Sequence, residues 1–322
     1  MIIRITRRKA LLLSALAAPA LLRPRRAFAQ DVVRIGLPTK TYWPTIVTQA
    51  AVTQKLFEKE GIGAEPTVYR GGAEAFEALA AGAADIVLDA PALTAAGIRK
   101  GVASKVVAGG ATGYMGWHLL VRSDSPITAV DQLRDKKVGI TSAGSGSDLL
   151  AQWTIQNHKI SFTRVPLGGG GLVPNLLSRN VDAAVVYSPL SFQMMQAGQA
   201  RSLIDYFAAV PPHLAAGWIA TDRLIADNPA MVQKSLNALF GGLAWLRANR
   251  APAITLIAEV DEITPQIAEA EYEATTLKLS TDGAMPLEHV EAALELSKLG
   301  GMTDLAPAAD IFTTRFKPVP TT

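Results

Sequence analysis

The sequence predicts an α/β protein of two similar lobes, each a parallel-rich sheet flanked by helices, with a cleft between the lobes. Short strands rich in β-branched residues alternate with helical segments, which is the pattern of βαβ units. The 322 residues exceed what a single hydrophobic core usually serves. A glycine–helix–strand pattern also occurs twice, because residues 71–93 align with residues 170–190, with Asp85 opposite Asp182 and Pro91 opposite Pro189. This repeat indicates two related lobes, with chance likeness as the alternative.

The first half of the chain contains four expected strands. Each is a short apolar run with β-branched residues, and the first three are each followed by a helix that glycine or proline opens or ends. The strands are expected at residues 32–37, 66–70, 85–88 and 105–108. The helices are expected at about 45–60, from Gly71-Gly72 to Gly82, and from Pro91 onward.

The second half repeats this pattern and then becomes helical. Strands are expected at residues 137–141, 162–167 and 182–186, with helices from about Asp148 and after the glycines at 168–171. From Asn228 onward, apolar residues at spacings of three or four predict amphipathic helices. We expect these helices to pack on the first lobe, at residues 229–250, 268–279 and 287–299.

Residues 1–29 have the pattern of an export signal. Basic residues precede an apolar run at 10–22, and Ala27-Phe28-Ala29 provides a cleavage site before Gln30. The run is short for a bilayer span, which favours a cleaved signal peptide over a membrane anchor. Residues 6–11 also resemble a twin-arginine signal, so the choice between the general and the twin-arginine route stays open.

The net charge of the chain depends on whether this segment is removed. The full sequence has 31 basic and 28 acidic residues, a formal charge of +3 and a pI near 9.1. Seven basic and no acidic residues lie in 1–29, so the remaining chain has 24 basic residues against 28 acidic ones, a net charge of −4. Nucleic acid is therefore not an expected partner. The absence of cysteine excludes disulfides, thiolate metal sites and a lipid-anchored N-terminal cysteine.

Several short motifs follow one another in an order typical of one family. They are Glu60-Gly61 after an aromatic loop and helix, Gly71-Gly72 with Asp85-Ile86, the stretch 122–139, the stretch 182–185, Ala226-Asp227-Asn228-Pro229, and Ser280-Thr281-Asp282-Gly283. Over residues 32–316 the chain thereby resembles extracytoplasmic solute-binding proteins of ABC importers. The resemblance is to the branch that binds nitrate, sulfonates, taurine or pyrimidine precursors.

The resemblance implies a two-lobed periplasmic-binding-protein clamshell of type II, in which the chain crosses between the lobes twice. We place the crossings near 109–115 and 207–215, so that lobe 1 comprises residues 31–110 and 212–322 and lobe 2 comprises 111–211. It also implies a small-molecule ligand held by hinge closure, a membrane permease as partner, no enzymatic activity and no cofactor. We expect a monomer in the periplasm.

Candidate ligand contacts follow from the strand ends. In parallel α/β sheets the ligand lies beyond the carboxyl ends of the strands, where helix N-termini suit an anionic group. Each candidate also has a structural interpretation: an aromatic residue can pack between the lobes, Asp89 can cap the helix at Pro91, and the serine-rich loop can be flexible. The candidates are Tyr42, Trp43, Asp89, Ala90, Tyr114, Trp117, Ser142, Ser145, Gly146, Tyr187 and Trp218.

The nature of the ligand is only partly indicated. These loops hold no cluster of arginines, which disfavours a multiply charged anion, and their aromatic residues favour an aromatic acid, an aromatic sulfonate or a pyrimidine-like compound. The four histidines show no metal-ligand spacing, and no nucleophile elbow or dinucleotide motif occurs. The alternatives are an enzyme on the same scaffold, with Asp89 and a histidine as an acid–base pair, or a sensor for a membrane kinase.

Overall fold

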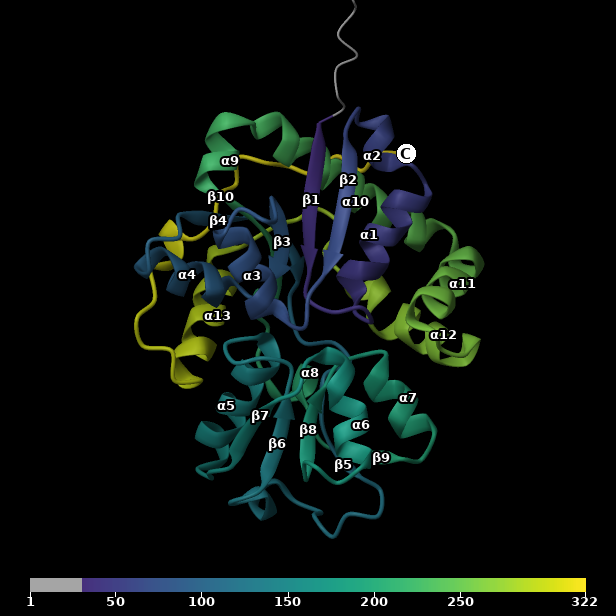
Figure 1. The fold of residues 1–322 in the computed structure, drawn as a ribbon, viewed down its shortest axis with the longest axis vertical. Coiled ribbons are helices and arrows are strands. Elements are labelled where there is room, and N and C mark those ends of the chain that lie inside the picture. The colour runs from purple at the N-terminus through teal and green to yellow at the C-terminus, as the bar shows by residue number, and fades with distance from the viewer. Residues whose placement is uncertain (1–30) are drawn as a thin grey trace, which may run out of the picture. The chain divides into compact units, whose positions relative to one another are not determined.

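Two sheets of five strands organise residues 31–322, the part of the chain that the computed structural model describes (Figure 1). The predicted export signal at 1–29 lies outside the described residues. The first sheet has the order β2-β1-β3-β10-β4 and the second the order β7-β6-β8-β5-β9. The strands are β1 (Val32–Leu37), β2 (Gly63–Val68), β3 (Ile86–Asp89), β4 (Ser104–Ala111), β5 (His118–Arg122), β6 (Lys137–Ile140), β7 (Thr163–Pro166), β8 (Ala183–Val186), β9 (Ala200–Asp205) and β10 (Ala216–Thr221).

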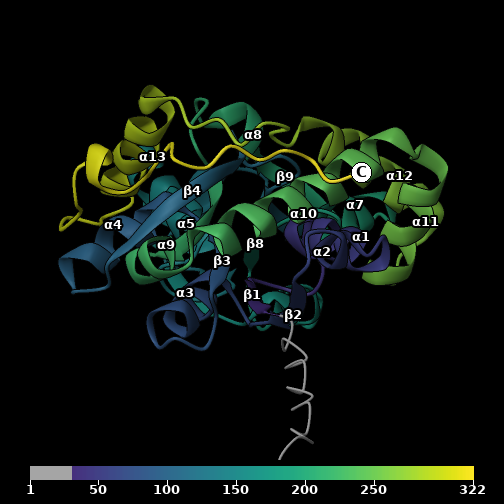
Figure 2. The same cartoon turned by 90° about the horizontal axis from the view of Figure 1, so that it is seen from above.

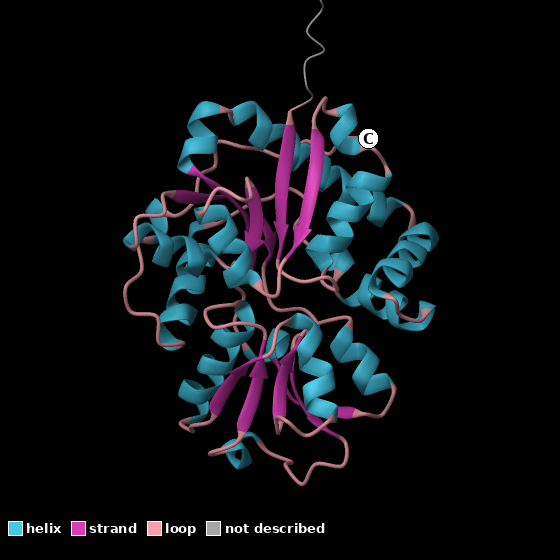
Figure 3. Cartoon of the chain, in the orientation of Figure 1, coloured by secondary structure: helices cyan, strands magenta, loops and turns pink. Residues whose placement is uncertain are grey.

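Helices lie on both sides of each sheet, which confirms the predicted α/β fold class (Figure 3). The α-helices are α1 (Trp43–Thr53), α2 (Leu56–Lys59), α3 (Gly72–Ala80), α4 (Pro91–Arg99), α5 (Gly146–His158), α6 (Leu172–Leu177), α7 (Leu190–Gln196), α8 (Tyr206–Ala209), α9 (Asp222–Asp227), α10 (Pro229–Ala248), α11 (Arg250–Asp261), α12 (Pro265–Ala274) and α13 (Leu287–Leu299). Within residues 31–322, no helix has the length and apolar character needed to span a bilayer.

The two sheets share one strand order, which accounts for the repeat in the sequence. Strand β3 occupies the centre of the first sheet and β8 the centre of the second, and each is followed by a helix. Each central strand has two parallel strands on one side, β1 and β2 or β6 and β7. The aligned segments at 85–93 and 182–190 are therefore equivalent parts of two similar lobes.

The sheets are less parallel than expected. Strand β10 runs antiparallel to β3 and β4, and β5 runs antiparallel to β8 and β9. The reason is the path of the chain between the sheets. It leaves the first sheet after β4 and enters the second at β5, then leaves after β9 and returns at β10. A strand that begins at the cleft must run opposite to strands that end there.

Lobe 1 is the part of the chain built on the first sheet, and lobe 2 is the part built on the second. The two connections lie between Ala111 and His118 and between Asp205 and Ala216, with the short α8 in the second one. The predicted division into 31–110 with 212–322 and 111–211 has its boundaries near these two connections. The exact boundaries of the two lobes stay a prediction.

The C-terminal helices contact both lobes. Helix α10 packs along α1 of lobe 1, and the C-terminal segment runs back beside α10, where the carbonyl oxygen of Thr322 accepts a hydrogen bond from Lys59 Nζ (Figure 2). Helix α12 also contacts α7, and α13 contacts both α4 and α5. The expectation that this region packs on the first lobe is therefore incomplete, because two of its helices also bridge to lobe 2.

Some element boundaries differ from the predictions. The helix expected at 45–60 is divided into α1 and α2 at Lys55, whose φ of 55° ends the first helix without a glycine or proline. Strand β2 begins at Gly63 instead of 66, because it pairs with β1 along its whole length, from Val32 opposite Gly63 to Leu37 opposite Val68. Helix α11 and the strands β5, β9 and β10 were not predicted.

Candidate ligand-binding site

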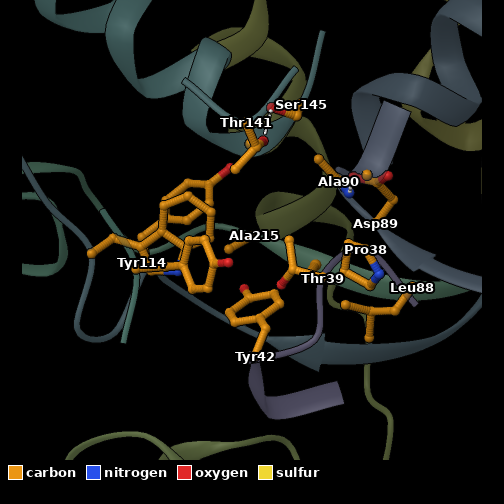
Figure 4. A pocket seen from close by; sticks show the side chains of 15 residues that line it. Pro38, Thr39, Tyr42, Leu88, Asp89, Ala90, Tyr114, Thr141, Ser145 and Ala215 are labelled. Carbon is orange, nitrogen blue, oxygen red and sulfur yellow. Dashed lines mark hydrogen bonds between the residues drawn. The ribbon is translucent and has the colours of Figure 1, made fainter. Parts of the chain in front are cut away.

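A narrow cavity lies where the carboxyl ends of β1 and β3 of lobe 1 face those of β6 and β8 of lobe 2 (Figure 4). Its volume is about 40 Å³, room for roughly three water molecules. The lobes are therefore nearly closed around it. The lining residues are Pro38, Thr39, Tyr42, Gly72, Leu88, Asp89, Ala90, Tyr114, Trp117, Thr141, Ser145, Gly146, Tyr187, Ala215 and Ala216.

Asp89 ends β3 and supplies the cavity with a buried carboxyl group. Its Oδ1 accepts a hydrogen bond of 2.7 Å from the backbone N–H of Ala90, whereas Oδ2 has no partner within residues 31–322. Burial raises the pKa of Asp89 to about 7, with the Ala90 N–H opposing the rise. A side chain on Gly72, the first residue of α3, would collide with this carboxyl group, so glycine is needed there.

The loop after β1 places two further side chains at the cavity. Thr39 is buried, and its carbonyl oxygen accepts a hydrogen bond of 2.7 Å from Thr45 Oγ1, which fixes the loop against the start of α1. Tyr42 precedes α1 in an extended conformation, with φ of −149°, so its ring leaves the helix axis towards lobe 2. Burial raises the pKa of Tyr42, which keeps its hydroxyl protonated.

Aromatic rings from three parts of the chain form one wall. The ring centroid of Tyr42 lies 5.6 Å from that of Trp117 and 5.4 Å from that of Tyr187, in edge-to-face arrangements. Trp117 lies 5.4 Å from both Tyr114 and Tyr187. These spacings are those of favourable aromatic pairs. A planar ligand can replace one such ring contact with its own when the lobes open.

Lobe 2 contributes hydroxyl groups at the beginning of α5. Thr141 Oγ1 lies 2.8 Å from Ser145 Oγ and 2.9 Å from Ser147 Oγ, and Ser145 Oγ donates to the carbonyl oxygen of Ser142. Gly146 is the first residue of this 13-residue helix, whose N–H groups and partial positive charge face the cavity. The hydroxyl network thus holds the helix start in a fixed position.

The polarity of the lining decides what the cavity can hold. Among the described residues, no lysine, arginine or histidine lines it, and Asp89 supplies its one carboxyl group. Four lining residues carry buried polar atoms with no hydrogen-bond partner in residues 31–322, namely Thr39 Oγ1, Asp89 Oδ2, Tyr114 OH and Tyr187 OH. Because such atoms cost free energy when unpaired, they indicate where a ligand or water would bind.

The cavity brings together most of the residues predicted from the sequence. Those at its wall are Tyr42, Asp89, Ala90, Tyr114, Trp117, Ser145, Gly146 and Tyr187. The prediction omitted other lining residues, among them Thr39, Gly72 and Thr141. Thr39 and Thr141 each follow a strand, so a systematic use of the strand-end rule would have included them.

Three predicted residues lie elsewhere. Trp43 is the first residue of α1, and its ring packs edge-to-face on Trp218 of β10, 6.4 Å between centroids, on the core side of the sheet. Both tryptophans are buried and line a separate small gap against α10, so packing explains them. Ser142 lies beside the cavity without lining it, and its Oγ faces Gly71 of lobe 1 across the seam.

No histidine of residues 31–322 lines the cavity. His213 packs on Tyr114, 5.1 Å between ring centroids, and its Nδ1 lies 2.7 Å from the carbonyl oxygen of Pro211. Burial lowers the pKa of His213, which keeps the ring neutral. Over residues 31–322 no group of three or more His, Asp and Glu side chains is arranged to hold a metal ion.

Comparisons with known proteins agree with this architecture. A Brucella abortus protein described as a binding protein is 24% identical over 303 residues, which are 90% of this chain and 88% of that protein. The alkanesulfonate-binding protein SsuA of Xanthomonas axonopodis, solved with bound MOPS, has a TM-score of 0.73 at 18% identity and covers 88% of this chain and 98% of its own. SsuA of Escherichia coli, an aliphatic sulphonate binding protein, has a TM-score of 0.72 at 18% identity, with coverages of 90% and 93%.

The same fold occurs in DszB, solved in complex with biphenyl-2-sulfinic acid. That structure has a TM-score of 0.59 at 15% identity and covers 85% of this chain and 94% of its own. At these identities the solved structures show the fold, a two-lobed periplasmic-binding-protein arrangement. The sequence itself matches a family model over residues 47–259, which is more than half of the chain. With its two lobes and the cavity between them, the chain belongs to the phosphonate-type periplasmic substrate-binding proteins of ABC transporters.

Proposed function

We propose that this protein captures a small planar nitrogen heterocycle of the pyrimidine type and delivers it to the permease of an ABC importer. The single observation that carries the ligand class is the composition of the cavity wall. It combines four aromatic rings with one buried carboxyl group, Asp89, and no basic side chain among the described residues. A planar aromatic ligand that carries an N–H donor can pack against these rings and donate a hydrogen bond to Asp89.

The unpaired polar atoms support the same class. Asp89 Oδ2 can accept a hydrogen bond from a ring N–H or an amino group. The hydroxyls of Tyr114, Tyr187 and Thr39 can donate to a ring nitrogen or a carbonyl oxygen. A phosphonate dianion fits less well, because it would lie beside Asp89 with no lysine or arginine to balance its charge. The helix start at Gly146 offers partial charge only.

Aromatic acids and sulfonates are the competing ligands, and pH separates them from the heterocycle. The pKa of Asp89 is raised to about 7 by burial. An N–H donor needs the ionised carboxylate and therefore binds more tightly above pH 7. An anion needs the protonated carboxyl group as a donor and therefore binds more tightly below pH 7. The direction of the pH dependence thus distinguishes the two classes.

The test is calorimetry and thermal shift with a defined panel at pH 6 and pH 8. The panel contains an aminopyrimidine, benzoate, benzenesulfonate, taurine and methylphosphonate. We expect micromolar or tighter binding of the aminopyrimidine, strengthened at pH 8. Tight binding of only taurine or methylphosphonate would contradict the proposal, and so would an aromatic anion that binds best at pH 6.

An enzymatic role has less support. The acid–base pair considered from the sequence would join Asp89 to a histidine, but none of the residues 31–322 that line the cavity is a histidine. Incubation of the bound ligand with the protein, followed by mass spectrometry, should return it unchanged. The permease as partner, the periplasmic location of the mature chain and its monomeric state complete the proposed function.

A further inference from the structure

Two buried carboxyl groups lie outside the cavity, where the C-terminal helices meet lobe 2. Asp261 ends α11 with 5% of its surface exposed, and Glu271 lies in α12 with 1% exposed. In the described part of the chain, both carboxylate oxygens of Asp261 and Oε1 of Glu271 have no hydrogen-bond partner. Neither group binds to a basic side chain in these residues. Packing alone gives no reason for two acids at this position.

A chain of hydroxyl groups connects Glu271 to the other lobe. Its Oε2 accepts a hydrogen bond of 3.1 Å from Thr275 Oγ1, and Thr275 Oγ1 lies 3.0 Å from Ser188 Oγ. Ser188 and Thr275 are almost fully buried. Ser188 follows Tyr187 in the loop of lobe 2 before α7, and α7 packs beside α12 (Figures 1 and 2). The contact therefore exists only while the two lobes are together.

The surroundings of the two acids favour their protonated forms. Helix α7 carries no charged residue, and among the described residues the side chains of Tyr42, Tyr187 and Lys40 are titratable groups that approach the pair. Lys40 approaches Asp261 but is paired with the exposed Glu262 at 2.5 Å. Burial raises the pKa of Asp261 to about 7 and that of Glu271 to about 8. Ser188 and Thr275 partly oppose the rise at Glu271, and Asp261 adds to it.

We infer that Glu271, with Asp261 beside it, is a proton-dependent positioning group for the closed arrangement of the lobes. Lobe 2 covers the carboxyl groups when the lobes close, which is favourable for a neutral acid and unfavourable for an anion. When the lobes separate, water reaches the seam and the carboxylates ionise. Closing therefore takes up protons. This role goes beyond the ligand class and does not depend on it.

The sign of the effect follows from the raised pKa values. A carboxyl group whose pKa is higher in the closed form than in the open form stabilises the closed form. This contribution is complete at a pH below the pKa of the open form, and it is lost as the pH rises to the pKa of the closed form. For Glu271 the window extends from about 4.5 to about 8. Each proton taken up changes the ratio of closed to open molecules by up to about tenfold per pH unit.

The test measures closure directly, without any ligand. The chain contains no cysteine, so two introduced ones can carry a donor and an acceptor dye. Thr67→Cys in β2 and Ser178→Cys after α6 are exposed positions on lobe 1 and lobe 2. Energy transfer between the dyes is recorded from pH 5 to pH 9. We expect the closed fraction to fall as pH rises, with at least a tenfold change in the closed-to-open ratio.

The decisive variant is Glu271→Gln, which has the shape of the protonated acid and cannot ionise. We expect it to have a larger closed fraction at pH 8.5 than the unmodified protein and a weaker pH dependence, with Asp261 and Asp89 supplying the part that remains. Glu273→Gln is the matched control, since Glu273 lies on the same helix, is exposed and pairs with Arg250 at 3.1 Å. This control should follow the pH profile of the unmodified protein.

Two results would overturn the inference: a closed fraction independent of pH in the unmodified protein, or an unchanged pH profile in Glu271→Gln. If Glu271→Gln does not fold, Asp261→Asn and Ser188→Ala test the same seam. Asp261→Asn should weaken the pH dependence, whereas Ser188→Ala should extend it to higher pH, because the Ser188 hydroxyl opposes the rise in the pKa of Glu271. An unchanged profile in both variants also overturns the inference. Because no ligand is present, a failure here is independent of a failure of the proposed ligand class.

Discussion

Asp89 is a residue at which the costs to stability and the proposed role in binding can be compared. Its carboxyl group lies in the cavity wall with one oxygen unpaired, and burial raises its pKa to about 7. Above pH 7 the folded protein must therefore bury an anion that the unfolded chain exposes to water. At the end of the central strand β3, its Oδ2 offers the proposed ligand an acceptor that has no partner within residues 31–322.

The substitution Asp89→Asn should separate these two effects. A raised folded-state pKa means that stability is lost as pH rises through about 7, so removing the charge should stabilise the ligand-free protein at pH 8. We expect a gain of about 1–4 kcal/mol in the free energy of unfolding. Binding of an N–H donor should fall by about tenfold or more. Urea unfolding and calorimetry at pH 8 measure both, and unchanged affinity would exclude Asp89 from the ligand contacts.

Tyr187 provides a second prediction at this scale. Its hydroxyl is buried at the cavity and has no partner in residues 31–322, so Tyr187→Phe should leave the stability of the ligand-free protein unchanged or raise it. Ligand affinity should fall by about five- to twentyfold, the usual effect of one lost hydrogen bond. Calorimetry with the bound ligand measures the fall.

Tyr206→Phe is the matched control. Its hydroxyl lies 2.8 Å from Thr154 Oγ1 inside lobe 2, away from the cavity wall. This variant should lose about 1 kcal/mol of stability and keep its affinity. The opposite assignment, with Tyr206 affecting affinity and Tyr187 affecting stability, would refute the proposed contacts.

At the scale of elements, the loop between β7 and α6 closes on lobe 1. The backbone N–H of Gly169 donates a hydrogen bond of 3.0 Å to the carbonyl oxygen of Arg70 at the end of β2. A Cβ on Gly169 would lie 2.5 Å from both Thr39 Cγ2 and Tyr187 OH. A side chain at this position therefore cannot fit when the lobes are together. This close approach explains Gly169, and a left-handed φ of 71° explains Gly168.

Gly169→Ala should consequently weaken ligand binding by about tenfold or more, because the methyl group holds the lobes apart. Gly170→Ala is the control, since a Cβ there meets no atom within 4 Å. The two variants should differ less in unfolding temperature than in affinity, because the collision with Thr39 of lobe 1 arises only on closure, whereas the close contact with Tyr187 lies within lobe 2. Calorimetry and thermal unfolding measure the two effects, and equal affinities for the two variants would be incompatible with this role.

The direction of the strands could be predicted from the sequence only for the parallel ones. The sequence indicates the parallel strands well, because each is a β-branched run followed by a helix. It does not indicate β5 and β10, whose direction depends on where the chain enters each sheet. It also fails at Lys55, where a non-glycine residue adopts a left-handed conformation that composition does not signal.

At the scale of the whole molecule, the exposed large apolar side chains of the described residues are distributed over several elements of both lobes and the C-terminal segment. They are Val32, Val68, Leu177, Phe207, Leu287, Leu299 and Val319. Obligate oligomers usually expose a continuous apolar surface when separated, so this distribution supports a monomer. Size-exclusion chromatography with light scattering should give the mass of a single chain. A stable dimer at micromolar concentration would contradict this expectation.

Export is a further prediction for the whole chain. Cleavage before Gln30 should leave a product with net charge −4, as counted from 24 basic and 28 acidic residues. Intact-mass measurement of protein recovered from the extracytoplasmic fraction identifies the first residue. Recovery of the uncleaved chain from membranes would favour the anchor interpretation instead.

The sequence by itself determined the alternation of strands and helices, the two lobes, the family and the strand ends that carry Asp89 and Tyr187. Those features depend on local composition and on spacing along the chain, which a single sequence displays. Only the tertiary structure decided that Tyr42 faces the cavity while Trp43 faces the core, and that Asp261 and Glu271 are buried. Burial is set by contacts between distant segments, so neither outcome could be obtained from neighbouring residues alone.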